Sequence, residues 1–131
     1  ARFPARHFLA FEVQYQFALR LFRRVEQAEL TNLWVSDDDA RYTLPRLLPL
    51  ASVQIWHILM PDPWWKRKHQ QRRLFSPPFV SFLADRTAPG GVLRVETDVA
   101  GYADFIAELL TAEPRFAPHD PALGTLFAED R

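Results

Sequence analysis

The chain has 131 residues, no cysteine and a formal net charge of zero, and 48% of its residues are hydrophobic, as expected of one compact globular domain over residues 1–131. Without cysteine it can form neither disulfides nor zinc knuckles nor a thiol nucleophile, and no apolar run reaches the length of a membrane span. Both features favour a cytoplasmic protein without a membrane. Because the net charge is zero, binding to a polyanion requires local clustering of cations.

Apolar and amphipathic segments alternate through the first half of the chain. The apolar run 8–13 predicts a buried strand, and the apolar residues of 14–30 recur at helical spacing. Residues 33–35 predict a second strand. The acidic turn that follows can cap a helix over 40–48. Residues 53–60 are apolar enough for a strand in the interior of a sheet.

The second half continues the alternation after one irregular stretch. Residues 61–73 show no clean period and are predicted to form a long functional loop that runs into a helix start. A helix beginning at Ser76, a Pro-Gly-Gly turn at 89–91, a strand over 92–96 and a helix over 102–110 follow. This order predicts an α/β fold with a mostly parallel sheet flanked by helices. In such sheets, ligands bind at the carboxyl ends of the strands.

Two acidic positions follow the first two predicted strands. Glu12 could accept both hydroxyls of an adenosine ribose, or it could be a surface carboxylate favoured by a helix N-terminus. Asp39 and Ala40 could meet an adenine edge. However, Asp39 with its two acidic neighbours equally suits a solvated helix cap. The residues alone leave both pairs of alternatives open.

The third strand ends in the sequence Met60-Pro61-Asp62-Pro63-Trp64. A carboxylate between two prolines sits on a stiff backbone, because each proline fixes its own φ and restricts the residue before it. Such rigidity suits a group that orients a substrate. The alternative is a turn aspartate that bonds to its own backbone. The tryptophans and cations that follow favour the functional interpretation of Asp62.

A basic segment follows directly, with Trp64 and Trp65 in front of Lys66, Arg67, Lys68, His69, Arg72 and Arg73. Cations bind phosphates and aromatic faces stack on exposed bases, as recognition of unpaired RNA requires. A run of charges can also be a solvated surface. Here the cations are concentrated at one strand end of a neutral chain, which favours nucleic acid. His57, in the middle of a strand, is expected to be a core or interface residue.

Together these segments resemble the bacterial tRNA (guanine-N7)-methyltransferase family. The resemblance covers roughly residues 3–116 and rests on six matched segments: His7 to Glu12, Asn32 with Asp39-Ala40, Pro61-Asp62-Pro63-Trp64, the basic segment, Pro89-Gly90-Gly91, and Thr97-Asp98 with Tyr102. The proline-aspartate-proline-tryptophan and basic segments are the most specific of these. The resemblance implies a Rossmann-like class I methyltransferase fold, incomplete at its amino terminus.

The same resemblance implies transfer of a methyl group from S-adenosylmethionine to N7 of the variable-loop guanosine of tRNA, without a metal. It places Glu12 on the cofactor ribose and Asp39 with Ala40 on the adenine. Asp62 becomes the carboxylate beside the target guanine. The residues implied to contact tRNA or the guanine are Lys66, His69, Arg72, Arg73, Asp98 and, from a looser match, Thr125 and Glu129.

The family's glycine-rich Glu-Ile-Gly-x-Gly-x-Gly segment is not among the 131 residues. Our hypothesis is that the chain is a fragment, or that this segment is supplied elsewhere; tight binding of S-adenosylmethionine by the 131-residue chain alone would contradict it. Two alternatives stay open: a catalytically degenerate RNA-binding relative, and a methyltransferase acting on another substrate. The sequence does not distinguish a monomer from a homodimer.

Overall fold

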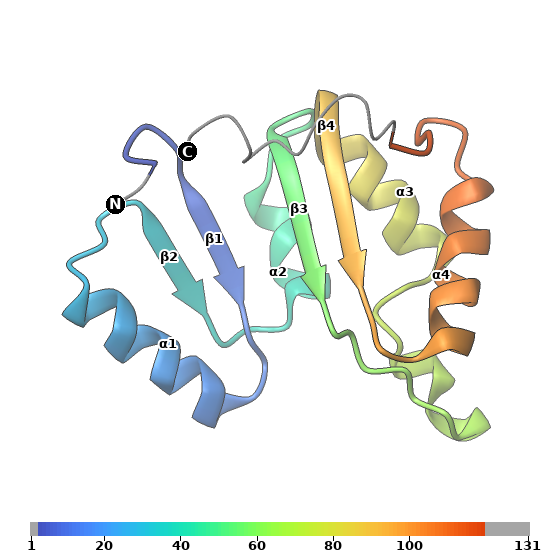
Figure 1. Cartoon of the computed structure of the whole chain (residues 1–131), viewed down its shortest axis with the longest axis horizontal. Coiled ribbons are helices and arrows are strands. Elements are labelled where there is room, and N and C mark those ends of the chain that lie inside the picture. The colour runs from blue at the N-terminus through green and yellow to red at the C-terminus, as the bar shows by residue number, and fades with distance from the viewer. Residues whose placement is uncertain (1–2, 120–131) are drawn as a thin grey trace. The chain divides into compact units, whose positions relative to one another are not determined.

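The computed structural model describes residues 3–119 (Figure 1). They fall into two compact units, one ending at Leu47 and the other beginning at Leu48. Each unit contains one pair of parallel strands and the helices that follow those strands. The predicted α/β class with parallel strands is therefore confirmed. In the part that the structure describes, no helix is long and apolar enough to cross a membrane.

The first unit has the order strand, helix, strand, helix. β1 (Phe8–Phe11) and β2 (Leu33–Ser36) are parallel neighbours, and α1 (Tyr15–Gln27) connects them. The short helix α2 (Ala40–Leu47) follows β2. Each of these elements was predicted, and its ends differ from the prediction by at most a few residues.

Asn32 ties the chain before β1 to the start of β2. Its side chain is buried, and its amide nitrogen donates to the carbonyl oxygens of Phe3, at 2.9 Å, and Arg6, at 2.7 Å. The backbone carbonyl of Asn32 accepts from the amide of Phe8 at 2.9 Å. A side-chain amide suits this position because it has two N–H donors. Asn32 therefore has a structural role in aligning the two strands.

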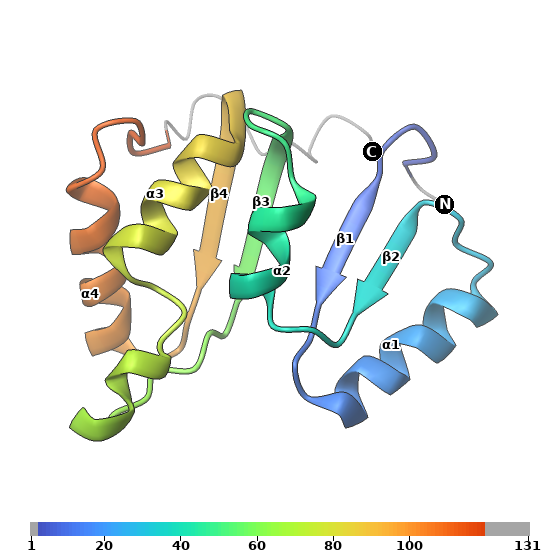
Figure 2. The same cartoon turned by 180° about the vertical axis from the view of Figure 1, so that it is seen from behind.

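The second unit carries most of the predicted site residues. Its elements are β3 (Val53–Leu59), the 3-10 helix η1 (Arg67–Arg72), α3 (Pro77–Arg86), β4 (Thr87–Glu96) and α4 (Ala100–Thr111). β3 and β4 are parallel neighbours. Both views show α3 lying against one face of this pair (Figures 1 and 2).

Aromatic and aliphatic side chains of β3, α3, α4 and the segment before α3 form the core of the second unit. The side chains that are at most 9% exposed there are Trp56, Phe75, Phe79, Val80, Leu83, Tyr102 and Ile106. Ser76 caps α3, its hydroxyl accepting from the amide of Phe79 at 3.3 Å, and a proline occupies the first helical turn. The predicted helix start at Ser76 is confirmed, and Phe79 and Leu83 lie in the core, while Phe82 is half-buried.

The Pro-Gly-Gly segment lies inside β4 rather than in a turn before it. Pairing passes from Val53 opposite Thr87 directly to Ile55 opposite Val92, so the residues between form a bulge. Gly90 has a left-handed φ of 76° there. The strand therefore begins at Thr87 and not at residue 92, because Thr87 pairs with Val53 beyond the bulge, while residues 88–91 have no partner in the ladder.

Gly91 occupies a place where no side chain fits. A Cβ atom there would lie 2.7 Å from Thr87 Cγ2 and 2.8 Å from the carbonyl oxygen of Ala88. Thr87 cannot rotate away freely, because its hydroxyl accepts from the indole of Trp56 at 2.9 Å and donates to the carbonyl of Leu83 at 2.7 Å. Only glycine avoids this overlap.

Replacing Gly91 with alanine should therefore destabilise the protein by about 1–3 kcal/mol, the usual range for overpacking. Urea unfolding of the complete natural protein that contains this chain would measure the loss. Gly101→Ala is the matched control, since a Cβ at Gly101 meets nothing within 4 Å. Equal stability of the two variants would contradict the steric argument.

The two strand pairs are separate ladders. Within residues 3–119, hydrogen bonds join β1 to β2 and β3 to β4, and no ladder joins one pair to the other. Two strands alone are marginally stable in water. Each pair therefore depends for its stability on packing against other parts of the protein.

Candidate active site

The loop after β3 presents Asp62 from a strained backbone. Met60 before it and Trp64 after it have left-handed φ angles of 50° and 42°. Residues other than glycine rarely adopt such backbone angles. Pro61 and Pro63 each fix their own φ, and Pro63 also restricts Asp62 before it. The exposed Asp62 thus extends from a segment with little freedom, as the sequence predicted, and its catalytic role stays a prediction.

Asp62 and Asp98 leave the sheet at the same edge. The amide of Met60 donates to the carbonyl of Glu96 at 2.8 Å, which continues the β3–β4 pairing beyond the end of β3. Asp98 comes two residues after that carbonyl, and both aspartates are exposed. The pairing of β3 with β4 thus brings the two carboxylates to neighbouring strand ends, and their roles stay predictions.

An open hollow of about 730 Å³ lies beside Asp98, between β4 and α4. Its lining is mostly apolar, with Leu93 and Val95 from the strand and Ile106 from the helix. Thr97 and Asp98 add polar groups to the lining. Apolar walls with a few polar groups are typical of small-molecule sites, so Asp98 borders a space of suitable size for a base.

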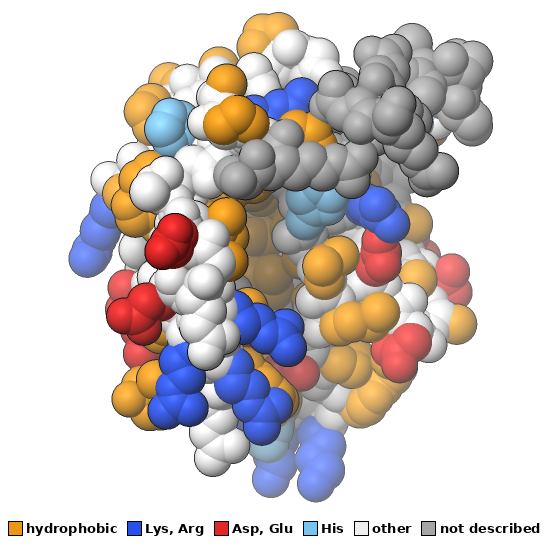
Figure 3. All heavy atoms as spheres, turned by 60° about the vertical axis from the view of Figure 1, so that its left-hand side comes forward, with side chains coloured by type: hydrophobic (Ala, Val, Ile, Leu, Met, Phe, Trp, Pro, Cys, Tyr) orange, Lys and Arg blue, Asp and Glu red, His pale blue; other side chains and the backbone are white. Residues whose placement is uncertain are grey.

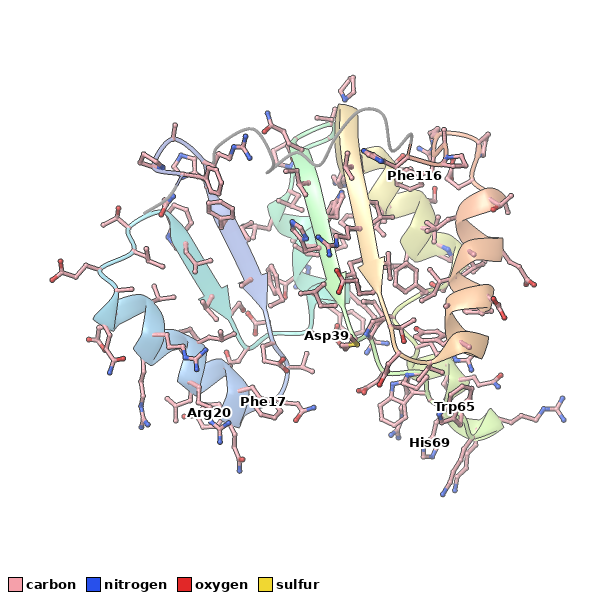
Figure 4. All side chains as sticks on the ribbon, in the orientation of Figure 1. Phe17, Arg20, Asp39, Trp65, His69 and Phe116 are labelled. Carbon is pink, nitrogen blue, oxygen red and sulfur yellow. The ribbon has the colours of Figure 1, made fainter. Side chains whose placement is uncertain are left out.

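The exposed cations of the basic segment lie beyond the end of β3. Lys66, Arg67 and Lys68 are exposed, and the indole of Trp65 is 61% exposed. Figure 4 shows Trp65 and His69 past the arrowheads of β3 and β4. Figure 3 brings forward the side of the first unit, where Lys and Arg side chains lie among hydrophobic ones. Cations beside an exposed aromatic face are the combination that RNA binding requires.

Trp64 packs within the site rather than facing solvent. Its ring meets the ring of His69 edge-on at 5.7 Å, and the Arg72 guanidinium lies over it, 5.4 Å from the ring centroid. The sequence grouped Trp64 with Trp65 as stacking surfaces. The structure separates them, because Trp64 is half-buried against the 3-10 helix while Trp65 is exposed. His69 and Arg72 therefore contact the loop, and their predicted contacts with tRNA stay predictions.

Arg73 faces the loop and α4. Its Nε donates to the carbonyl oxygen of Pro63 at 2.6 Å. Its guanidinium carbon lies 5.2 Å from the Tyr102 ring centroid and 5.0 Å from that of Phe105. The sequence placed Arg73 with the other cations as a tRNA contact, and nothing in the pattern of residues distinguishes it from Arg72.

Tyr102 is a buried residue whose ring lies under the Arg73 guanidinium. Its side chain is 0% exposed, and burial raises the pKa of its hydroxyl. The backbone of Phe75 and the charge of Arg73 act against that rise in the pKa, and the charge of Asp62 adds to it. Tyr102 therefore lies close enough to sense both charges. The sequence matched Tyr102 to a family position but assigned it no role.

Glu12 follows the end of β1, where it is half-buried and one of its carboxylate oxygens already accepts a hydrogen bond. Its backbone amide donates to the carbonyl of Ser36 at 3.0 Å, and its Oε1 accepts from the amide of Gln14 at 2.8 Å. The carboxylate thus caps the chain just before α1. The helix-start and ribose alternatives are compatible, since Oε1 serves the cap and a carboxylate has further lone pairs to offer.

Asp39 is held by Arg41 at the start of α2. Arg41 donates from its backbone amide at 2.9 Å to Oδ1 and from its guanidinium at 2.6 Å to Oδ2. This pairing lowers the pKa of Asp39. The cap interpretation of Asp39 is confirmed, and its carboxylate is already occupied. Ala40, the first residue of α2, belongs to the turn whose amides lack partners within the helix.

The remaining predicted residues are Thr125, Glu129 and His57. Thr125 and Glu129 lie outside the described residues, so their roles stay predictions. His57 was expected in the core or an interface, but it is exposed on β3 opposite Arg94. The core alternative is wrong because alternate residues of β3 face away from the buried Trp56.

A protein-family model described as "Putative methyltransferase" matches residues 1–122. The match spans most of the chain, so the chain belongs to this methyltransferase family. In the described part, no group of three or more His, Cys, Asp or Glu side chains could hold a metal ion.

Curated relatives carry a more specific name, tRNA (guanine-N(7)-)-methyltransferase. The one from Polaromonas naphthalenivorans is 41% identical over 111 residues, covering 85% of this chain and 45% of that protein. The one from Nitrosomonas europaea is 41% identical over 113 residues, covering 86% and 50%. The one from Mycobacterium avium is 39% identical over 118 residues, covering 90% and 46%. The chain thus spans about half the length of the curated relatives it matches.

Proposed function

We propose that the complete protein containing this chain transfers a methyl group from S-adenosylmethionine to N7 of the variable-loop guanosine of tRNA, in the cytoplasm. The main support is Asp62, which extends from a strained loop at a sheet edge directly before the basic segment. The relatives named above, which share about two fifths of their residues with this chain, support the same activity.

In this proposal Asp62 orients the guanine. Guanine N7 has a lone pair, so no strong base is needed to create a nucleophile. The rate can come largely from holding N7 in line with the methyl donor. An exposed carboxylate on a stiff backbone can accept from the N1 and N2 donors of guanine and stabilise positive charge developing on the ring. Asp98, on the same sheet edge, would hold the base from the side of the hollow.

The exposed part of the basic segment would hold the tRNA. Lys66, Arg67 and Lys68 would contact phosphates, and Trp65 offers a face for a base that has left its stack. His69 and Arg72 pack against Trp64, so we assign them a share in holding this surface as well as contacts with RNA.

The first unit offers groups that fit S-adenosylmethionine, which would supply the methyl group on its sulfonium. Glu12 would accept the ribose hydroxyls with the carboxylate capacity left over from its bond to Gln14. The amide of Ala40 would donate to the adenine edge, since the first turn of a helix has unpaired N–H groups. Asp39 would act through the backbone it caps, because Arg41 engages its carboxylate.

A methylation assay tests the proposal. The complete protein, S-adenosylmethionine and an unmodified tRNA transcript should give 7-methylguanosine at the variable-loop position. A transcript with adenosine at that position is the control and should not be modified. Binding of tRNA without methyl transfer would favour a degenerate RNA-binding relative, and methylation of another acceptor would favour a different substrate.

Replacing Lys66 with alanine should weaken tRNA binding and reduce its salt dependence. Each phosphate contact contributes about 0.7–0.9 to the slope of log affinity against log salt concentration, so the slope should fall by about that amount. Filter binding over a range of salt concentrations would measure it. Lys66 is exposed and bonds to its helix only through its backbone carbonyl, so the fold should not change. An unaltered slope would remove Lys66 from the tRNA interface.

A further inference from the structure

Arg73 is the last cation of the basic segment, yet its contacts are with the protein. The Nε hydrogen bond to Pro63 is short, at 2.6 Å. The guanidinium lies over two rings that stack on each other, Tyr102 and Phe105, whose centroids are 6.0 Å apart with planes inclined by 14°. Arg73 is half-buried, whereas Lys66, Arg67 and Lys68 are exposed.

The loop that Arg73 contacts needs an external anchor. Met60 and Trp64 hold left-handed backbone angles that cost free energy, and such angles persist only when the surroundings enforce them. Pro61 and Pro63 have no amide hydrogen, so the loop has few donors with which to tie itself down. Its Pro63 carbonyl is instead fixed from outside, by Arg73.

The other end of this anchor is part of the core. Tyr102 is 0% exposed and belongs to α4, which packs against α3. Contacts therefore run from the buried Tyr102 ring through the guanidinium to the Pro63 carbonyl. That carbonyl is one residue from Asp62, so a shift of the guanidinium would move the carboxylate.

We propose that Arg73, seated on the Tyr102–Phe105 ring pair, is a positioning residue that fixes Asp62 for methyl transfer and does not contact tRNA phosphate. The proposal rests on the function proposed above. It separates Arg73 from Lys66 and Arg72, to which the sequence assigned the same contact with tRNA.

Arginine suits this role better than lysine. A planar guanidinium can lie on aromatic faces while its Nε points in the plane toward a carbonyl oxygen. A lysine ammonium is a compact charge on a flexible stem and cannot satisfy both requirements at once. A phosphate contact would be more tolerant, because lysine also binds phosphate as a charge.

The test compares Arg73→Ala and Arg73→Lys with Lys66→Ala in the complete protein. For Arg73→Ala we expect kcat to fall about 10- to 100-fold, as small misplacements of reacting groups do. The KM for tRNA and the salt slope of binding should stay close to wild type. Arg73→Lys should fail to restore kcat. Lys66→Ala should show the opposite pattern, with a raised KM and a reduced salt slope. If Arg73→Ala shows the Lys66→Ala pattern, or leaves kcat unchanged, the proposal is wrong.

A second variant covers the case in which Arg73→Ala fails to fold. Phe105→Leu removes one ring beneath the guanidinium and leaves every cation in place. It should lower kcat with an unaltered salt slope. Wild-type kcat in Phe105→Leu would overturn the role of the ring pair.

A readout without activity separates failure of this proposal from failure of the proposed function. The order parameters of the Trp64 and Trp65 amides, from ¹⁵N relaxation, should fall from rigid values of about 0.85 toward 0.6 in Arg73→Ala. If the wild-type protein methylates no tRNA, the proposed function is wrong, and these order parameters alone decide whether Arg73 anchors the loop. Unchanged order parameters would overturn the anchor itself.

Discussion

Replacing Asp62 with asparagine should lower kcat for tRNA methylation by about 10²- to 10³-fold, the usual effect of removing a preorganised polar group at a reacting centre. The asparagine side chain keeps the size of aspartate but presents an N–H donor to a guanine edge that also donates. One of the two contacts is kept through the remaining oxygen, and the other becomes repulsive. The developing positive charge on the base also loses its counter-charge. Single-turnover methylation of unmodified tRNA by the complete protein would measure the change.

The fold should tolerate this substitution. Asp62 is exposed, and the loop is held by its prolines and by Arg73 rather than by the carboxylate. Asp62→Ala should therefore reduce turnover sharply too, with an unfolding midpoint close to wild type. Asp104→Asn is the matched control, since Asp104 is an exposed carboxylate on α4. Turnover in Asp62→Asn equal to that of the control would remove Asp62 from the mechanism.

Replacing Glu12 with glutamine should weaken binding of S-adenosylmethionine by about 10- to 100-fold. Hydrogen bonds to a charged group contribute about 1.5–3 kcal/mol. With Oε1 bonded to the Gln14 amide, the carboxylate has a second charged oxygen for the ribose, which glutamine replaces with a neutral NH₂ donor. Glutamine keeps an oxygen that can accept from the Gln14 amide, so the cap before α1 should survive. Isothermal titration calorimetry on the complete protein would give the dissociation constant.

Glu26, in the same unit, provides the control variant for Glu12→Gln. Glu26→Gln removes one exposed negative charge from α1 and should leave binding unchanged. A dissociation constant for Glu12→Gln within about twofold of this control would show that Glu12 is only a helix-start residue. Weakened binding in both variants would instead indicate a general effect of charge.

Much of the local structure could be predicted because it follows from local patterns. The apolar run of β3, the helical spacing of α1 and the serine-proline start of α3 each encode one element, and the structure contains all three. The bulge in β4 could not be predicted from the pattern alone. Proline and glycine usually mark turns, and only the pairing of β4 with β3 keeps Gly91 inside a strand.

Part of the candidate site could likewise be predicted from the sequence, and part could not. The sequence placed Asp62 and Asp98 each after a strand, at the edge where parallel strands end, and the structure showed that these two strands are neighbours. The sequence could not predict the different contacts of the cations. Arg72 lies over Trp64 but stays exposed. The half-buried Arg73 lies over two rings of α4, a helix that begins more than twenty residues later.

The sequence by itself determined the α/β class, the order of the elements, the methyltransferase family and the stiff backbone at Asp62, because each depends on residue type and short spacing. Only the tertiary structure decided that Arg41 engages Asp39, that Trp64 is packed while Trp65 is exposed, and that Arg73 contacts the Pro63 carbonyl. The physical reason is that a charge or a ring acquires its role from the groups packed beside it. For Arg73, those groups come from a distant part of the chain.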